Sequence, residues 1–208
     1  MTPPVVMHFA GGGTPTAVTA QIAASGDDCY ARESSTFTNT STSNWCGHVS
    51  TSAFNYRSMM RFQLAVPQGA PIDSATMEQY SQGQIQNGGA VFPLATTVRA
   101  EAVDDAAQVV DYADFTSRES VLTTAAVGWD ASTASGQWGS SAWRVSPDIK
   151  NVIQEVVNRP GWVSGGYINL WWGPTDPAYS MAQDITIQGT SYDDVPAEAA
   201  KLNVTYLA

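Results

Sequence analysis

Residues with catalytic chemistry are scarce in this chain of 208 residues. Its two histidines are His8, close to the N-terminus, and His48, in a segment rich in Ser, Thr and Asn. Nucleophilic and general acid–base catalysis need a nucleophile held beside a base, and histidines in such surroundings are usually exposed and have no catalytic role. The sequence therefore predicts a protein that is not an enzyme.

Adjacent aspartates are the best candidates for binding a metal ion, and they occur in three places: Asp27-Asp28, Asp104-Asp105 and Asp193-Asp194. Calcium prefers several carboxylate and carbonyl oxygens that converge from loops. No pair belongs to an Asp-x-Asp-x-Asp pattern, and acidic pairs in turns are usually just hydrated. We expect no cofactor, with a structural calcium ion as the alternative.

The two cysteines, Cys29 and Cys46, allow two interpretations. A disulfide between them would close a loop of polar residues that has little else to order it. Two reduced thiols are the commoner state in a chain that is not secreted. Both interpretations stay open, whereas these two cysteines and two histidines do not make a credible zinc site.

Seven tryptophans favour a role in sugar binding, because flat aromatic rings stack on pyranose faces. Trp45 and Trp138 have polar, Gly- and Ser-rich surroundings, which favours exposure and makes them the candidate glycan-binding residues of the alternative, carbohydrate-binding function. Trp171 and Trp172 are adjacent on a predicted strand, so one must face inward and the other outward. The remaining tryptophans are expected to pack in the core or against a helix.

The net charge of the chain limits the classes of partner that it can bind. The formal net charge is -10, with only nine Lys and Arg residues, so a phosphate backbone would be repelled. Nucleic acids and anionic membranes are therefore not expected as partners. The N-terminal residues lack the basic and apolar regions of a secretory signal, and no segment reaches membrane-spanning length. We expect either a mature fragment or a chain that leaves its cell otherwise, such as by lysis after particle assembly.

Short segments of alternating apolar and polar residues must position these side chains. The clearest is 57–66, where Met60, Phe62, Leu64 and Val66 fall on one face. With 43% hydrophobic residues, 13% charged residues and many turn formers, the chain suits β architecture. We predict an all-β fold, a jelly-roll-like antiparallel β-sandwich, as a single domain over 17–208. The other predicted strands are 18–22, 72–80, 94–102, 121–129, 167–172, 182–188 and 201–207.

Three segments depart from the strand pattern. One short α-helix is predicted over 146–158, with Ser146 as N-cap, Pro147 at the first helical position and an apolar stripe that follows. Residues 1–16 are rich in Pro and Gly, which predicts a flexible N-terminal arm. Residues 33–53, which include Trp45 and Cys46, are expected to form a long polar loop.

Several stretches together resemble a family of jelly-roll β-sandwich modules that is sometimes named for a DNRLRE motif. Such modules occur in bacterial surface and secreted proteins and in bacteriophage virion proteins. The resemblance implies a sandwich without a catalytic role, and it favours Asp27 and Asp28 as the ligands of any structural calcium ion. It rests on Arg61-Phe62, Pro67-Gln68-Gly69, Ser146-Pro147-Asp148-Ile149, Asn158-Arg159-Pro160-Gly161-Trp162 and Leu202-Asn203-Val204-Thr205-Tyr206.

We therefore expect a virion structural protein, a bacteriophage capsid decoration (cement) protein that stabilises the head by bridging capsid subunits. Its arm, through Val5, Val6, Met7 and Phe9, would lie along the major capsid protein or another virion protein. Edge strands of a sandwich also favour a homo-oligomer on the virion surface. The alternative is an extracellular carbohydrate-binding or adhesion module, or a phage head-fibre or tail component.

Overall fold

The computed structural model describes residues 13–49, 54–86, 94–130, 138–139, 141–175 and 185–208. Within them the chain forms antiparallel strands and two short α-helices, so the predicted all-β sandwich is confirmed. The helices are α1 (Tyr112–Arg118) and α2 (Lys150–Val157). The strands are β1 (Pro15–Gln21), β2 (Asp28–Arg32), β3 (Thr36–Thr38), β4 (Ser43–Val49), β5 (Phe54–Gln63), β6 (Ile72–Gln86), β7 (Ala95–Ala100), β8 (Val127–Asp130), β9 (Ala142–Val145), β10 (Tyr167–Pro174), β11 (Ile185–Thr190) and β12 (Lys201–Leu207).

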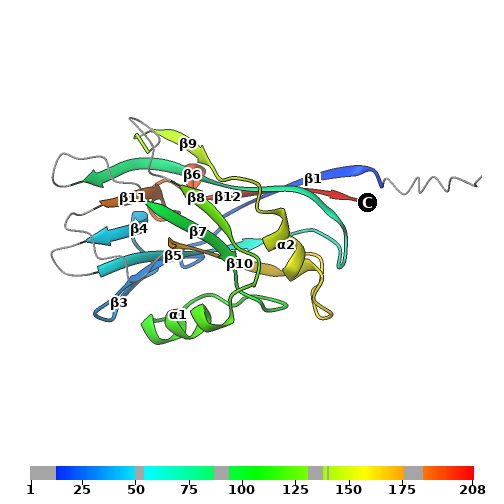
Figure 1. Ribbon diagram of the computed structural model, residues 1–208, viewed down its shortest axis with the longest axis horizontal. Helices are drawn as coiled ribbons and strands as arrows, with labels where there is room; N and C mark the ends of the chain where they lie inside the picture. Colours follow the sequence, from blue (N-terminus) through cyan, green and yellow to red (C-terminus); the bar gives the residue numbers. More distant parts are fainter. Residues whose placement is uncertain (1–12, 50–53, 87–93, 131–137, 140, 176–184) are drawn as a thin grey trace, which may run out of the picture.

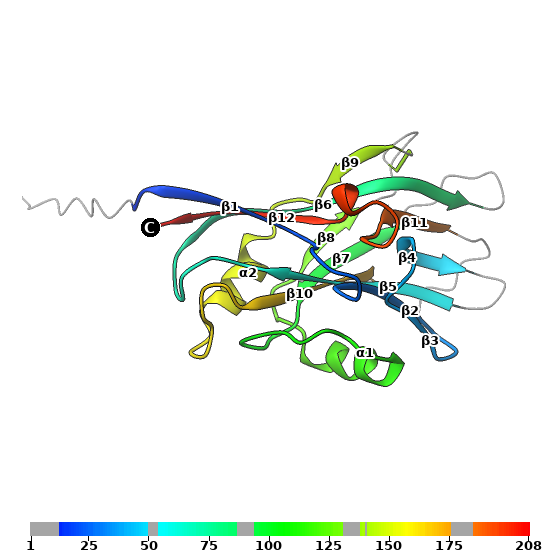
Figure 2. The same ribbon diagram turned by 180° about the vertical axis from the view of Figure 1, so that it is seen from behind.

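The strands follow one hydrogen-bonded path, β1-β12-β6-β11-β4-β5-β10-β7-β8, which curls over so that its two halves face each other. In Figures 1 and 2, β1, β12, β6 and β9 lie in the upper half, and β5 and β10 lie below them. β9 pairs with β6, β2 pairs with β5, and β3 pairs with β2. The first and last strands pair along their whole length, from Pro15 opposite Leu207 to Gln21 opposite Lys201.

The main core fills the space between the halves, because alternate side chains of each strand point inward. Met60 and Phe62 of β5 and Leu202 of β12 are at most 1% exposed. Helix α2 packs against β6 of one half and β7 of the other (Figure 1), and its apolar side chains are fully buried. β-branched residues are mediocre helix formers, so this burial stabilises α2 more than intrinsic propensity does.

A second, smaller core lies on the outer face of the lower half, between the sheet and α1. There Met59 and the partly buried Trp171 pack towards Phe115 of α1, whereas their neighbours Met60 and Trp172 face the main core. The inward and outward orientation predicted for Trp171 and Trp172 is thus confirmed. Helix α1 itself was not predicted, because Phe115 is its only buried side chain and leaves no apolar stripe.

The predicted helix starts too early, at residue 146 instead of Lys150. Ser146 and Ile149 donate their backbone N–H groups to Met77 and Ala75 of β6, and the Ser146 hydroxyl accepts from the Met77 N–H. Residues 146–149 are therefore tied to β6 and precede the helix, whose N-cap is Ile149. The expected end of the helix, near Asn158, agrees with the structure.

The predicted loop 33–53 is also wrong, since it contains β3 and β4, and β4 lies between β11 and β5. Two polar side chains of β4 are buried and paired rather than solvated: Asn44 donates to Asp28, and His48 lies 3.0 Å from Asn55. The predicted arm, 1–16, is also too long at its C-terminal end, because β1 already begins at Pro15. Neither described helix is long and apolar enough to cross a membrane.

Candidate functional site

An aromatic surface forms where β2, β4 and β5 meet. The rings of Tyr30, Trp45 and Tyr56 are half-buried, and their centroids lie 5.2 to 6.3 Å apart. Arg32 lies beside them, with its guanidinium 4.6 Å from the centroid of the Phe54 ring and 5.6 Å from that of Tyr56. These five residues are called the aromatic surface below. It combines apolar rings with one cation, a combination found at the centres of binding interfaces.

The strands fix this surface through register. Tyr56 pairs with both Arg32 of β2 and Gly47 of β4, so three segments that are distant in sequence meet at one residue. Gly47 has a φ of 135°, and a Cβ there would lie 2.3 Å from the carbonyl oxygen of Ile185. Only glycine allows β4 to approach β11 so closely, and Trp45 is held two residues away.

Hydrogen bonding and burial keep the aromatic surface uncharged apart from its arginine. The Arg32 Nη1 donates to the Tyr56 hydroxyl at 3.1 Å, which holds both side chains in place. Burial, with a smaller effect from Tyr56, raises the pKa of the Tyr30 hydroxyl, which stays protonated at neutral pH. The surface therefore presents rings, hydroxyls and one guanidinium, which can bind but lack a nucleophile with its base.

The ring planes at this surface are tilted, by 53° between Tyr30 and Trp45 and by 31° between Trp45 and Tyr56. A sugar ring stacks best on a flat, open ring face. Tilted rings instead make a contoured apolar surface, which is suited to the side chains of a protein partner.

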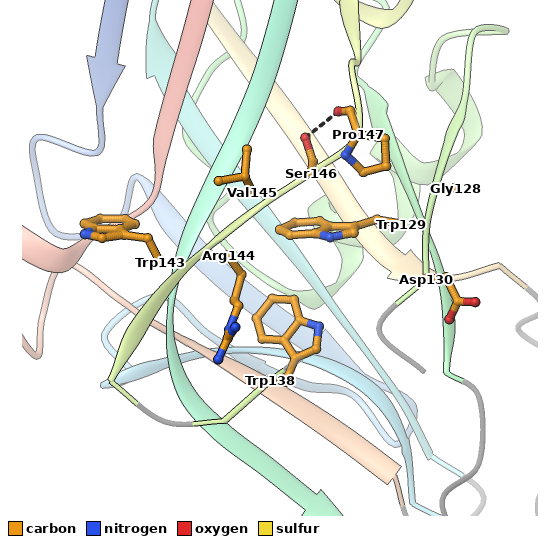
Figure 3. Close-up of a pocket in the computed structure, with 9 residues that line it drawn as sticks. All are labelled: Gly128, Trp129, Asp130, Trp138, Trp143, Arg144, Val145, Ser146 and Pro147. Carbon is orange, nitrogen blue, oxygen red and sulfur yellow. Dashed lines mark hydrogen bonds between the residues drawn. The ribbon is translucent and has the colours of Figure 1, made fainter. Parts of the chain in front are cut away.

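A cavity of about 620 Å³ lies between β8 and β9, and Figure 3 shows the residues that line it. Trp129 and Trp138 pack there with Trp172 at centroid distances of 5.3 to 5.5 Å. The prediction that Trp138 is exposed is wrong: its side chain is 2% exposed, because it completes this stack of indoles. Trp45 and Trp138, which we expected to act alike, thus belong to separate clusters.

Polar groups complete the lining of the cavity. Arg144 of β9 donates through Nη2 to the carbonyl oxygen of Gly139, while its buried Nε has no hydrogen-bond partner. Asp130 and Trp143 also line the cavity. The Trp143 ring packs edge-on against Tyr80 and lies under the Lys201 ammonium, 3.8 Å from it (Figure 3 shows this ring apart from the other two indoles). The cavity is of ligand size and mixed polarity.

Asp27 and Asp28 are buried at the start of β2, where each has a different partner. The Asp27 carboxylate pairs with Arg61 at 2.9 Å and accepts a hydrogen bond from Gln108. A cation at Asp27 would therefore compete with a guanidinium. In the part of the chain that the structure describes, no group of three or more His, Cys, Asp or Glu side chains is arranged to hold a metal ion.

Asp28 joins three segments through one carboxylate oxygen. Its Oδ2 accepts from the Asn44 side chain and from the Tyr192 N–H, both at 3.0 Å, while Oδ1 is buried with no hydrogen-bond partner. Burial raises the pKa of Asp28 from 3.8 to about 6, because desolvation outweighs the opposing effect of these two hydrogen bonds. Asp28 is thus a buried acid that ionises near neutral pH.

The two cysteines are free and buried, so of the two interpretations the structure has reduced thiols. Cys29 belongs to the small core under α1 and Cys46 to the main core, which places them on different faces of the sheet. His48 is buried beside Asn55, not exposed as its polar surroundings suggested. His8 and the arm residues Val5, Val6, Met7 and Phe9 lie outside the described residues.

The sequence could have indicated more of this surface than Trp45 alone. In β2, Tyr30 and Arg32 alternate with the buried Cys29 and Ala31, which is the pattern of a half-buried strand. The meeting of these residues with Tyr56 depends on long-range register, for which the local sequence has no signal.

Comparison with protein-family models gave no match to this chain, and comparison with curated proteins gave none either.

Proposed function

We propose that this chain is a non-catalytic virion structural protein, a capsid decoration protein that binds the assembled head through its aromatic surface. The observation that carries the proposal is the cluster of Tyr30, Trp45, Tyr56, Phe54 and Arg32 on adjoining strands. Tyrosine, tryptophan and arginine contribute most of the binding energy at protein interfaces, and here all three occur together.

The pairing of β1 with β12 also supports such a role. The pairing of β1 with β12 continues to Thr14 and Ala208, whose backbones exchange hydrogen bonds of 3.1 and 3.0 Å. Thr14 therefore lies beside Ala208 at the end of a firmly paired strand. A decoration protein that binds only the assembled shell stabilises it by mass action, and contacts of an arm add to those of the aromatic surface.

Cosedimentation tests the proposal. The purified chain is mixed with virions of the parent phage that lack it, and bound protein is measured after centrifugation. The wild type should bind and raise the temperature at which the heads release DNA, and Trp45→Ala should weaken binding at least about tenfold. Trp143→Ala is the matched control, since it removes a half-buried indole elsewhere. Absence of binding by the wild type would refute the proposal.

A carbohydrate-binding role is the second candidate, because the half-buried indole of Trp143 lines the cavity between β8 and β9 together with Asp130 and Arg144. Carboxylate and guanidinium groups orient sugar hydroxyls, while indoles contact the apolar face of the ring. A glycan array with the wild type and Arg144→Ala tests this role, with Trp45→Ala as the control for the other surface. A signal lost only in Arg144→Ala supports sugar binding in the cavity, and a blank array overturns it.

A further inference from the structure

One cation among the described residues has no partner there. Arg99, on β7, makes no ion pair, hydrogen bond or ring contact with any described residue, although it is half-buried. In a chain with nine Lys and Arg residues against 19 acids, an unpaired guanidinium stands out. The other cations are all engaged: Arg57, Arg61, Arg118, Lys150 and Arg159 with carboxylates, Arg32 and Lys201 with rings, and Arg144 with a carbonyl oxygen.

Arg99 lines a pocket of about 520 Å³ on the outer face of the lower half of the sandwich. The sheet forms the floor: Trp171 of β10 pairs in register with Met59 of β5 on one side and with Arg99 on the other. Leu122 and Ala126 add an apolar wall that follows α1 in the chain. The pocket therefore places one guanidinium next to an indole and aliphatic groups.

Contacts with Gly173 and Glu119 hold the Trp171 indole in this position. A Cβ added at Gly173 would lie 2.4 Å from two carbons of the Trp171 ring, so the ring lies against bare backbone. The Trp171 Nε1–H donates to Glu119 at 3.0 Å, which fixes the ring orientation. The floor of the pocket is thus built by specific contacts.

The other polar groups in the pocket already have partners. Glu119 accepts from Trp171 and pairs with Arg57, whose Nε lies 2.7 Å from its Oε1. The hydroxyls of Thr97 and Thr175 bond to each other at 2.7 Å. A sugar needs several open donors and acceptors for its hydroxyls, whereas this pocket offers one open cation among apolar groups. That arrangement suits a single carboxylate on an apolar stem.

We propose that this pocket binds a carboxylate on an apolar stem, supplied by an acidic side chain of the protein partner, with Arg99 as its ion-pair partner. The assignment of the carboxylate to a protein partner, called the protein source below, rests on the function proposed above. It is also favoured by charge: a net charge of -10 repels a free anion from solution, whereas a partner held by other contacts can deliver its carboxylate into the pocket.

Nuclear magnetic resonance tests the pocket directly. The indole N–H signal of Trp171, assigned with Trp171→Phe, is followed while hexanoate is added to the full ¹⁵N-labelled chain. Hexanoate should shift this signal with a dissociation constant on the order of 1 mM, and neutral hexanamide should not. A blocked Leu-Glu-Leu peptide is the second arm and should bind at least as well as hexanoate if the stem is a side chain. No shift with either carboxylate overturns the proposal, and a shift with hexanoate alone overturns the protein source.

Substitution separates this proposal from the proposed function. Arg99→Met keeps the stem and removes the charge, so it should weaken carboxylate binding at least about tenfold. Lys150→Met removes a charge from an exposed side chain and is the control. Virion binding by both variants follows as a second readout. If the wild type binds virions and Arg99→Met binds equally well, this inference fails and the proposed function stands. If no variant binds virions but hexanoate still shifts Trp171, the carboxylate site stands and the protein source falls with the proposed function.

Discussion

Replacing Asp28 with asparagine should favour the folded state more at pH 8 than at pH 4. Burial raises the pKa of this carboxyl from 3.8 to about 6, so the folded state binds its proton more tightly than the unfolded chain does. Because the folded pKa lies above the unfolded value, the contribution of Asp28 to stability is fully present below about pH 4 and is lost as pH rises through about 6.

The size of the effect follows from the shift in pKa. Each pKa unit corresponds to about 1.4 kcal/mol, so the shift from 3.8 to about 6 costs the ionised folded state about 3 kcal/mol at pH 8. Asp28→Asn carries no charge at either pH. Its new N–H group at the position of Oδ1 would have no partner, but that cost is the same at both pH values and cancels in the comparison.

Urea unfolding at the two pH values measures this difference. The free energy of unfolding of Asp28→Asn minus that of the wild type should be larger at pH 8 than at pH 4 by about 2 to 3 kcal/mol. The exposed Asp73 provides a control substitution, Asp73→Asn, for the loss of one negative charge. An equal difference at both pH values, or a larger one at pH 4, would refute the assignment of Asp28 as a destabilised buried carboxylate.

Three further predictions concern the frame of the molecule. Gly47→Ala should lower the free energy of unfolding by at least about 2 kcal/mol in urea titrations, because the positive φ and the contact with Ile185 both oppose a Cβ; a near-neutral effect would mean that β4 can shift. Ile153→Ala in α2 should cost about 2 to 5 kcal/mol, whereas Val163→Ala, at a side chain 69% exposed, should change stability by less than about 0.5 kcal/mol; similar losses would contradict the burial of α2. Ellman's reagent should not label the folded chain, because Cys29 and Cys46 are buried and burial raises the pKa of both thiols; labelling before unfolding would show that one of them is accessible.

Strands that alternate cleanly could be predicted from sequence, and strands that bury polar residues could not. β12 matches its predicted range of 201–207, since Leu202 and Val204 face the core and their neighbours do not. β4 escaped prediction because Asn44 and His48 are buried through hydrogen bonds to distant side chains. Polar composition indicates a loop only when those groups are solvated, and the local sequence cannot show which partners they find.

The candidate sites show the same limit. Trp45 was recognisable by its type and its polar surroundings, yet identical reasoning misplaced Trp138, which is buried in a stack of indoles. The local sequence does not single out Arg99, because an arginine on an alternating strand is normally a solvated residue. Only the pairing of every other cation distinguishes it, and that property belongs to the folded molecule.

The pairing of β1 with β12 has a consequence for synthesis. β1 is the first described strand to leave the ribosome, and the sheet path gives it one neighbour, β12, which is the last described strand to do so. Its backbone donors and acceptors stay unsatisfied during translation, when exposed strand edges invite association between nascent chains. The acidic charge of the chain then acts as protection at that stage, because like-charged nascent chains repel one another.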